Sequence, residues 1–303
     1  MRFFADSSSP ARNGPSRRNG FEGWYYKQRA GDYMLAFIPG RAEDGAFVQM
    51  IDPSGTRHFS MPEPVICGDT VRIGDCLFSP QGLRVSLPGV EGVLRYEGLT
   101  PLRSDIMGPF ARLPMQCRHG VVSMSHSVSG QITVDGTVHE FDRASGYCEK
   151  DAGRSFPRAY LWLQCNDFPC PVSVMAAVAH IPFLAFSFTG CLAVVVYAGT
   201  EYRFATYRGV RIEQCTPDHI RLRQGRLVLD LTLSPHDAGQ VLRAPLRGSM
   251  SADIRECRDA DLRLVLSDSS RIILDTCSSR ASCEVRPWDS VPNPAQTLLG
   301  RRV

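Results

Sequence analysis

The sequence predicts an all-β protein made mainly of antiparallel strands. Short runs rich in Val, Ile, Phe, Tyr and Thr recur along its 303 residues, and Gly, Pro, Asp and Ser bound these runs. This pattern is typical of strands joined by turns. No long helical repeat of apolar residues is convincing, and a hydrophobic content of 43% is sufficient for a folded core.

The runs that we interpret as strands follow one another along the whole chain. In order they include GAFVQMID (45–52), TRHFSM (56–61), DTVRIG (69–74), GLRVSL (82–87), GQITVDGTVHEF (130–141), EYRFATY (201–207) and RLVLDLTL (226–233). Strands of this length and spacing predict a barrel-like or sandwich-like sheet.

One segment, residues 173–199, contains no Asp, Glu, Lys or Arg and so has the composition of a membrane span. His180, Pro182 and a turn predicted at Thr189-Gly190 divide it into pieces of strand length. Its apolar residues are rich in Val, Phe and Ala. We therefore predict two buried strands joined by a turn rather than a membrane span.

The two halves of the chain repeat the same order of segments, with an offset near 140 residues. The five matched pairs are 24–40 with 162–183, 47–61 with 192–207, 71–76 with 210–215, 92–107 with 239–250, and 129–149 with 268–284. Five weak matches in one order predict an internal duplication.

This duplication sets the predicted domain organisation. We expect an N-terminal β domain at 20–155 and a C-terminal β domain at 156–290, with a mobile arm at 1–19 and a tail at 291–303. The arm is polar and Arg-bearing and lacks the apolar stretch of a secretory signal. The junction between the two domains is a predicted site.

Composition and missing motifs exclude several functions. The net charge is only +3 with no long basic run, which argues against nucleic-acid binding. The eleven cysteines form no CxxC pair and no zinc-like spacing, so we predict reduced, mostly buried thiols in a cytoplasmic protein. GxSxG, GxGxxG, Walker and HExxH motifs are absent, and we expect no metal and no cofactor. The functions that remain are acid–base catalysis without a cofactor and ligand binding without catalysis.

Lysine accounts for only two of the 34 basic residues, Lys27 and Lys150, and each neighbours aromatic residues. Because Arg serves elsewhere, these positions favour a compact ammonium group whose pKa shifts on burial. The alternative is that these two lysines have no functional role.

Strand alternation groups the polar and aromatic side chains into faces. The predicted groups are Glu22, Trp24 and Tyr26 opposite Tyr25 and Lys27; Tyr147, Glu149 and Asp151 opposite Cys148 and Lys150; and Trp162, Gln164 and Asn166 together. Such faces are typical of an apolar pocket with a few placed polar groups, although an aromatic core with polar caps gives the same pattern.

Two histidines, His119 and His126, stand seven residues apart. An odd separation on a regular strand sends them to opposite faces, so they are not expected to bind one metal together. One of them is a candidate acid or base, and the other is a candidate structural residue.

Three sequence blocks resemble the tocopherol cyclase family. They are FEGWYYK near residue 21, CRHGVVSMSHSVSGQITVDG (117–136) and SGYCEKDAGRSFPRAYLWLQCNDF (145–168), and the similarity extends from about residue 20 to 285. The resemblance implies two lipocalin-like β domains, an architecture that is shared with carotenoid hydratases. It departs from the plant-type pattern at Ala152, where a Trp is expected, and this change predicts a reshaped site.

The resemblance implies a cofactor-independent isomerase that closes a prenylated hydroquinone into a chromanol. An acid protonates the alkene and the phenol oxygen captures the cation. Glu149 or Asp151 is the candidate acid, His126 the candidate acceptor of the phenol proton, and Lys150 a candidate partner that would hold Glu149 ionised. The candidate substrate-binding residues are Glu22, Trp24, Tyr25, Lys27, His119, Tyr147, Trp162, Gln164 and Asn166.

Two other functions are weighed against this one. The first is a non-catalytic binding protein for a lipid or prenylquinone, and the second is a hydratase of an unsaturated lipid. All three predict a hydrophobic small molecule as the partner and no nucleic acid. Peripheral contact with a membrane is left open, as is the oligomeric state.

Overall fold

The computed structural model describes residues 20–183, 186–269 and 271–286, which form 21 strands and two short 3-10 segments. All strand pairings are antiparallel. The prediction of an all-β, antiparallel fold is confirmed. The predicted arm at 1–19 and tail at 291–303 lie outside the described residues.

The strands of the first half form one sheet. Its order is β4-β3-β2-β1-β11-β10-β9-β8-β7-β6-β5. The bounds are β1 Phe21–Ala30, β2 Tyr33–Ala42, β3 Gly45–Asp52, β4 Gly55–Met61, β5 Val65–Cys67, β6 Thr70–Ile73, β7 Cys76–Ser79, β8 Gly82–Leu87, β9 Val90–Glu97, β10 Cys117–Val134 and β11 Thr137–Gly153.

The second half forms the other sheet, in the order β15-β14-β13-β12-β21-β20-β18-β17-β16, and β19 pairs with β20 beside it. The bounds are β12 Tyr160–Cys165, β13 Val172–Phe183, β14 Phe186–Tyr197, β15 Thr200–Ala205, β16 Arg211–Thr216, β17 His219–Gln224, β18 Leu227–Pro235, β19 Gln240–Leu246, β20 Ser249–Asp268 and β21 Arg271–Val285.

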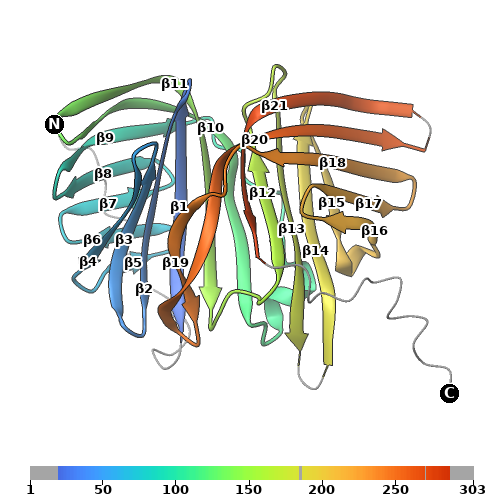
Figure 1. The fold of residues 1–303 in the computed structure, drawn as a ribbon, viewed down its shortest axis with the longest axis horizontal. Coiled ribbons are helices and arrows are strands. Elements are labelled where there is room, and N and C mark those ends of the chain that lie inside the picture. Colours follow the sequence, from blue (N-terminus) through green and yellow to red (C-terminus); the bar gives the residue numbers. More distant parts are fainter. Residues whose placement is uncertain (1–19, 184–185, 270, 287–303) are drawn as a thin grey trace.

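The two sheets share one plan. Each places its first strand beside its last, β1 beside β11 and β12 beside β21, and continues through antiparallel neighbours on both sides, although in the second sheet β18 rather than β19 follows β20. Figure 1 shows the resulting halves side by side, with β1 and β12 near the junction. The duplication and the domain bounds 20–155 and 156–290 stay predictions, which this common strand order supports.

Each half has its own hydrophobic core, and a third cluster lies between the halves. Phe37 and Phe78 belong to the core of the first sheet, and Phe204 and Leu231 to that of the second. The third cluster joins side chains from both sheets, including Tyr25, Met34, Met124, Tyr147, Trp162 and Met175. Strand alternation explains this arrangement, because side chains alternately face the sheet's own core and the opposite sheet.

The uncharged segment forms two paired strands. β13 and β14 are antiparallel neighbours, and Val174, Ala176 and Val195 are fully buried. The predicted turn at Thr189-Gly190 is wrong, because both residues lie within β14 and pair with His180 and Ala179. In the described part of the chain, no helix has the length and apolar character needed to span a bilayer.

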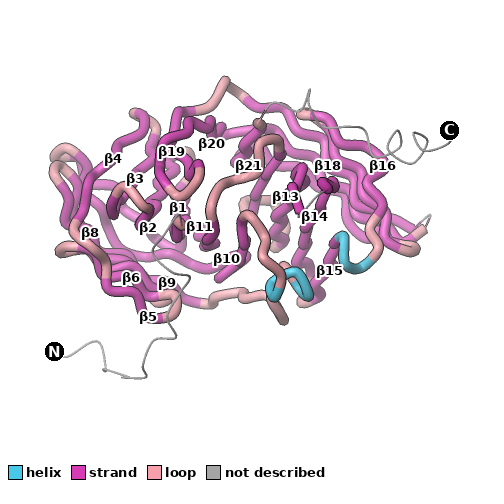
Figure 2. The backbone as a smooth tube through the Cα atoms, turned by 90° about the horizontal axis from the view of Figure 1, so that it is seen from below, coloured by secondary structure: helices cyan, strands magenta, loops and turns pink. Residues whose placement is uncertain are grey.

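Two segments cross from one sheet to the other. The bridging loop, residues 98–116, leaves β9 and contains the 3-10 segment η1 (Gly108–Arg112), which contacts η2 (Thr206–Arg208) of the second half. The bridging hairpin, residues 240–256, consists of β19 and the part of β20 that pairs with it. In Figure 2, seen from below, one 3-10 segment (cyan) lies near the junction of the halves and the other near β15, while β19 lies beside β20.

Backbone and side-chain hydrogen bonds fix the bridging hairpin to the first sheet. The amide of Gln49 donates to the Arg243 carbonyl at 3.0 Å and accepts from the Arg243 N–H at 2.9 Å. Thr56 Oγ1 donates to the Val241 carbonyl at 2.8 Å. The bridging segments therefore hold the two sheets together and enclose the space between them.

Candidate active site

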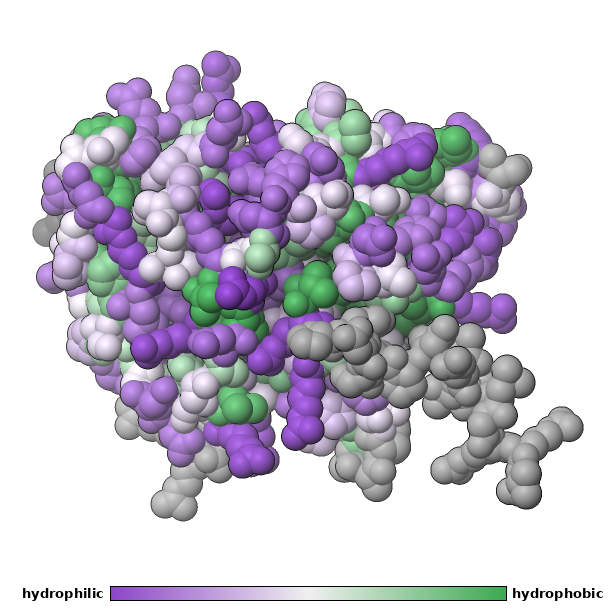
Figure 3. Space-filling view, viewed as in Figure 1, coloured by the Kyte–Doolittle hydropathy of each residue, from purple (hydrophilic) through white to green (hydrophobic). Residues whose placement is uncertain are grey.

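A cavity lies between the two sheets, enclosed by the bridging segments. It has a volume of about 1270 Å³ when its opening to solvent is included. Its lining is mainly apolar and includes Phe21, Met107, Phe110, Met115, Phe156 and Ile181. Figure 3 shows hydrophobic side chains (green) reaching the surface near the middle of one face, among hydrophilic ones (purple). An apolar cavity between two domains is a common ligand site.

The cavity brings together six of the sequence-predicted site residues and leaves out seven. Trp24, Tyr25, His119, Glu149, Asp151 and Trp162 contribute to its lining. The lining does not include Glu22, Lys27, His126, Tyr147, Lys150, Gln164 or Asn166.

Glu149 is the most enclosed acid of the cavity. On β11 it shares a face with Tyr147 and Asp151, as strand alternation requires. The Tyr147 hydroxyl donates to Glu149 Oε2 at 2.5 Å, and Trp162 Nε1 donates to the same oxygen at 3.2 Å. Burial raises the pKa of Glu149 to about 7, against the lowering effect of His119. Both protonation states are thus accessible near neutral pH.

His119 bridges the two carboxylates. Its Nδ1 lies 3.1 Å from Asp151 Oδ1, and its Nε2 lies 3.6 Å from Glu149 Oε2. Burial lowers the pKa of His119, but Glu149 and Asp151 raise it, and the net value is about 9. The imidazole is therefore a cation at neutral pH, placed to pass a proton between the two acids.

The same three residues have the spacing of a metal site. Ligand atoms of His119, Glu149 and Asp151 all lie within 4.8 Å of one another. These residue types could hold one divalent cation. Because Glu149 Oε2 already accepts hydrogen bonds from Tyr147 and Trp162, we interpret the group as a proton-transfer unit.

His126 lies on the other face of β10, so its predicted position in the pocket is wrong. Its ring centroid lies 4.4 Å from that of Tyr96 with the ring planes tilted by 46°, and its Nδ1 lies 3.2 Å from Ser123 Oγ. Burial lowers its pKa to about 4. A Cβ at Gly146 would lie 2.2 Å from His126 Nε2, so glycine is needed there. We interpret His126 as a neutral structural residue.

The predicted pairing of Lys150 with Glu149 is also wrong. Lys150 Nζ forms an ion pair with Asp69, and its side chain is 43% exposed. Alternation sends residue 150 to the face opposite Glu149 and Asp151. Ala152 lies two residues further along the strand, on the same face as Lys150, so the absence of a Trp at this position does not reshape the cavity directly.

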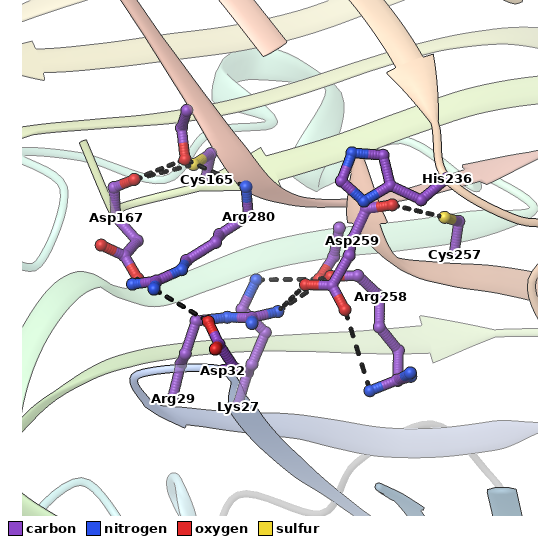
Figure 4. A network of polar contacts seen from close by, with 12 residues as sticks. Lys27, Arg29, Asp32, Cys165, Asp167, His236, Cys257, Arg258, Asp259 and Arg280 are labelled. Atoms are coloured by element: carbon purple, nitrogen blue, oxygen red, sulfur yellow. Dashed lines mark hydrogen bonds and ion pairs between the residues drawn. The ribbon is translucent and has the colours of Figure 1, made fainter. Parts of the chain in front are cut away.

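Lys27 serves the contact between the sheets. It is 2% exposed, and its Nζ donates to Ser282 Oγ of β21 at 2.9 Å. Burial and then Arg29 lower its pKa to about 8. Figure 4 shows it beside Arg29, whose guanidinium lies 2.7 Å from Asp259. The rare lysine is thus buried as the sequence suggested, but outside the cavity.

The remaining predicted binding residues satisfy polar groups around the cavity. Glu22 forms an ion pair with Arg41 at 3.1 Å. The Gln164 amide donates to Asn166 Oδ1 at 3.2 Å, and Asn166 Nδ2 donates to the Gly146 carbonyl at 2.8 Å. These three residues support the strands rather than contact a ligand in the cavity.

Sequence reasoning missed a second group of acids from the other sheet. The Tyr25 hydroxyl donates to Glu256 Oε1 at 2.5 Å, and the Tyr160 hydroxyl donates to Glu284 Oε2 at 2.6 Å. Burial raises the pKa of Glu256 to about 7 and that of Glu284 well above its usual range. The signal was present, because the matched segments 129–149 and 268–284 both end in glutamate.

These buried groups predict that the protein loses stability as the pH rises from 5 to 8. The raised pKa values of Glu149, Glu256 and His119 mean that the folded state binds protons more tightly than the unfolded state. The stabilisation from each group is complete at pH values below its pKa in the unfolded state. It is lost as the pH rises through its pKa in the folded state. One pKa unit corresponds to about 1.4 kcal/mol, so each of the three groups is expected to contribute a loss on the order of 2–3 kcal/mol across this range.

Thermal melts at pH 5, 6, 7 and 8 test this expectation. Glu149→Gln should flatten the pH dependence, because the amide does not titrate. Lys27 has the opposite effect on the pH dependence. Its pKa is lowered to about 8, so it increases the stability of the protein only as the pH rises above 8. A melting temperature that stays constant or rises from pH 5 to 8 would contradict the assignment of shared protons to this cluster.

Comparisons with known proteins identify a family and a fold that this chain resembles. A family model described as "Tocopherol cyclase-like" matches residues 98–286, more than half of the chain. The protein named "Probable tocopherol cyclase, chloroplastic" from Oryza sativa subsp. japonica is 28% identical over 211 residues, which are 63% of this chain and 44% of that protein. "Tocopherol cyclase, chloroplastic" from Zea mays is 28% identical over 199 residues, 60% of this chain and 42% of that protein. The chain thus matches less than half the length of these relatives.

Solved structures share the fold at low identity. The crystal structure of CghA with Sch210972 superposes with a TM-score of 0.60 at 11% identity and covers 88% of both chains. A candidate AttH protein from Nitrosomonas europaea superposes with a TM-score of 0.51 at 14% identity, covering 88% of this chain and 92% of that one. At these identities the likeness concerns the fold alone.

Proposed function

The chain belongs to the tocopherol cyclase-like family, and on this premise we propose that it closes a prenylated hydroquinone, or a related prenylated phenol, into a chromanol. The observation that carries the proposal is the buried unit of Glu149, His119 and Asp151 inside an apolar cavity. The names of the plant relatives support the reaction type. Cytoplasmic placement and peripheral membrane contact stay predictions.

The proposed reaction begins with protonation of the alkene. Glu149 in its acid form transfers a proton to the less substituted alkene carbon, and the positive charge develops on the tertiary carbon. An acid with a pKa near 7 is suited to this role at neutral pH. The apolar lining keeps water from the cation, and the Trp162 and Tyr25 rings, 5.9 Å apart, offer it aromatic surfaces.

Ring closure then restores the protonation state of the enzyme. The phenol oxygen forms a bond to the tertiary carbon and loses its proton to Asp151. His119, which contacts both carboxyl groups, gives a proton to Glu149 and takes the proton from Asp151, so that all three groups return to their starting states. One proton enters at carbon and one leaves oxygen, so the reaction is redox-neutral and consumes no other reactant.

Isotope incorporation tests the proposal. The purified protein is incubated with a prenylated hydroquinone in D₂O that contains H₂¹⁸O. We expect a chromanol that carries one non-exchangeable deuterium at the former alkene carbon and no ¹⁸O. A tertiary alcohol that contains ¹⁸O would instead show a hydratase. Ligand that is bound and recovered unchanged would show a binding protein.

A further inference from the structure

A second carboxyl group faces the same cavity from the opposite sheet. Glu284 on β21 contributes to the cavity lining, as does Tyr160 on β12. The Tyr160 hydroxyl donates to Glu284 Oε2 at 2.6 Å. The proton-transfer unit described above uses neither residue, although both lie at the wall of the cavity.

Glu284 occupies the position in its sheet that Glu149 occupies in the other. Glu149 pairs with Tyr25 of the first strand, and Glu284 pairs with Trp162 of β12. Tyr25 and Trp162 each donate a hydrogen bond across the junction to the other half. Trp162 Nε1 donates to Glu149, and the Tyr25 hydroxyl donates to Glu256, which pairs with Glu284 from β20. The cavity thus receives one equivalent carboxyl group from each sheet.

The surroundings of the two carboxyl groups differ. Glu149 has the cationic His119 at 3.6 Å, whereas Glu284 neighbours the acids Glu256 and Glu149. Burial and then Glu256 raise the pKa of Glu284 well above its usual range. The raised pKa favours the neutral form of this carboxyl group. With Oε2 accepting from Tyr160, the acid O–H is left as a donor, and a neutral carboxyl group can also accept from a hydroxyl.

We propose that Glu284, oriented by Tyr160, binds the ring hydroxyl of the hydroquinone that does not take part in ring closure, and so positions the aromatic ring while the alkene lies at Glu149. This inference rests on the proposed function and deepens it by assigning the two ends of the ligand. It makes Glu284 a specificity-determining residue. A ligand without a free hydroxyl would leave the buried carboxyl group without its partner.

Binding measurements test this assignment without turnover. Because a protein that keeps Glu149 would convert the hydroquinone, isothermal titration compares a prenylated hydroquinone with its dimethyl ether in the Glu149→Gln background, with Glu284 retained or replaced by Leu or Gln. We expect the protein that retains Glu284 to prefer the free hydroquinone by about three- to tenfold, the effect of one neutral hydrogen bond. Glu284→Leu should remove the preference, and Glu284→Gln should retain most of it because the amide also donates and accepts.

Two variants separate this proposal from the proposed function. Glu149→Gln should keep the preference for the free hydroxyl even though product formation is lost. Absence of chromanol in every variant would overturn the reaction while leaving the binding comparison valid. If Glu284→Leu does not fold, the same binding comparison is made with Tyr160→Phe. This variant should reduce the preference for the free hydroquinone over its dimethyl ether. An unchanged preference in Glu284→Leu, or in Tyr160→Phe where only that variant folds, would overturn the assignment of Glu284.

Discussion

Glu149→Gln is expected to reduce chromanol formation by about 10²- to 10⁴-fold, the range typical of losing a general acid. The amide keeps the shape of the side chain and can still accept hydrogen bonds from Tyr147 and Trp162. It has no acidic proton to give to the alkene. The measurement is the single-turnover rate at pH 6, where Glu149 with a pKa of about 7 is mainly protonated.

Two companion variants make this result specific. Glu140→Gln changes an exposed glutamate on the same strand and should leave the rate unchanged. Asp151→Asn should lower the rate as well, because it removes the acceptor of the phenol proton, and His119 would lose the partner at 3.1 Å. If Glu149→Gln forms product at the wild-type rate while binding ligand normally, Glu149 is not the acid.

The pH profile of the wild-type rate gives the same assignment a second test. Since the acid form of Glu149 is required, the rate of the protonation step should be constant below its pKa of about 7 and fall tenfold for each pH unit above it. A rate that rises from pH 7 to 9 would indicate that a deprotonated group limits the reaction. The profile is measured with ligand in excess, so that binding does not contribute.

Local alternation was enough to predict the acidic face of the site. The group of Tyr147, Glu149 and Asp151 follows from the period of two along one strand, which needs no knowledge of neighbouring strands. The choice between the two histidines needs the pairing of β10 with β11. The odd spacing already sends His119 and His126 to opposite faces, and the pairing of His119 with Asp151 shows which of them shares the acidic face. The sequence of β10 alone does not contain this register.

Contacts between distant segments account for the other errors. The partners of Lys27 and Lys150 are Ser282 and Asp69, which lie 255 and 81 residues away in the chain. No local pattern pairs such residues. The strands themselves were predictable because Gly, Pro and Asp mark their ends. The predicted duplication offered a usable signal for Glu284, since it aligns that residue with Glu149.

The bridging loop could not be predicted from strand patterns, and Arg203 anchors it. The Arg203 side chain is 1% exposed on β15. Its guanidinium donates to the carbonyls of Ser104 and Asp105, both at 2.8 Å, and lies 2.7 Å from Glu201. One buried cation of the second sheet thus fixes a loop of the first sheet whose residues Met107 and Phe110 line the cavity.

Arg203→Ala is therefore expected to destabilise the protein by about 3–5 kcal/mol, as for other buried ion pairs that lose one partner. The loss leaves Glu201 without its cation and the loop carbonyls without their donor. The free energy of unfolding in urea measures the effect. Ligand affinity should fall together with stability, because the loop forms one wall of the cavity.

Arg208→Ala is the matched control for this loss of charge. Arg208 is exposed in η2, a few residues along the chain, and its replacement should change the free energy of unfolding by no more than about 0.5 kcal/mol. Limited proteolysis distinguishes loss of the loop from general unfolding, since Arg203→Ala should expose cleavage sites at 98–116 at temperatures where the strands remain protected. Equal stability and equal loop protection in Arg203→Ala and Arg208→Ala would mean that other contacts hold the loop, and that the buried hydrogen bonds of Arg203 do not maintain this wall of the cavity.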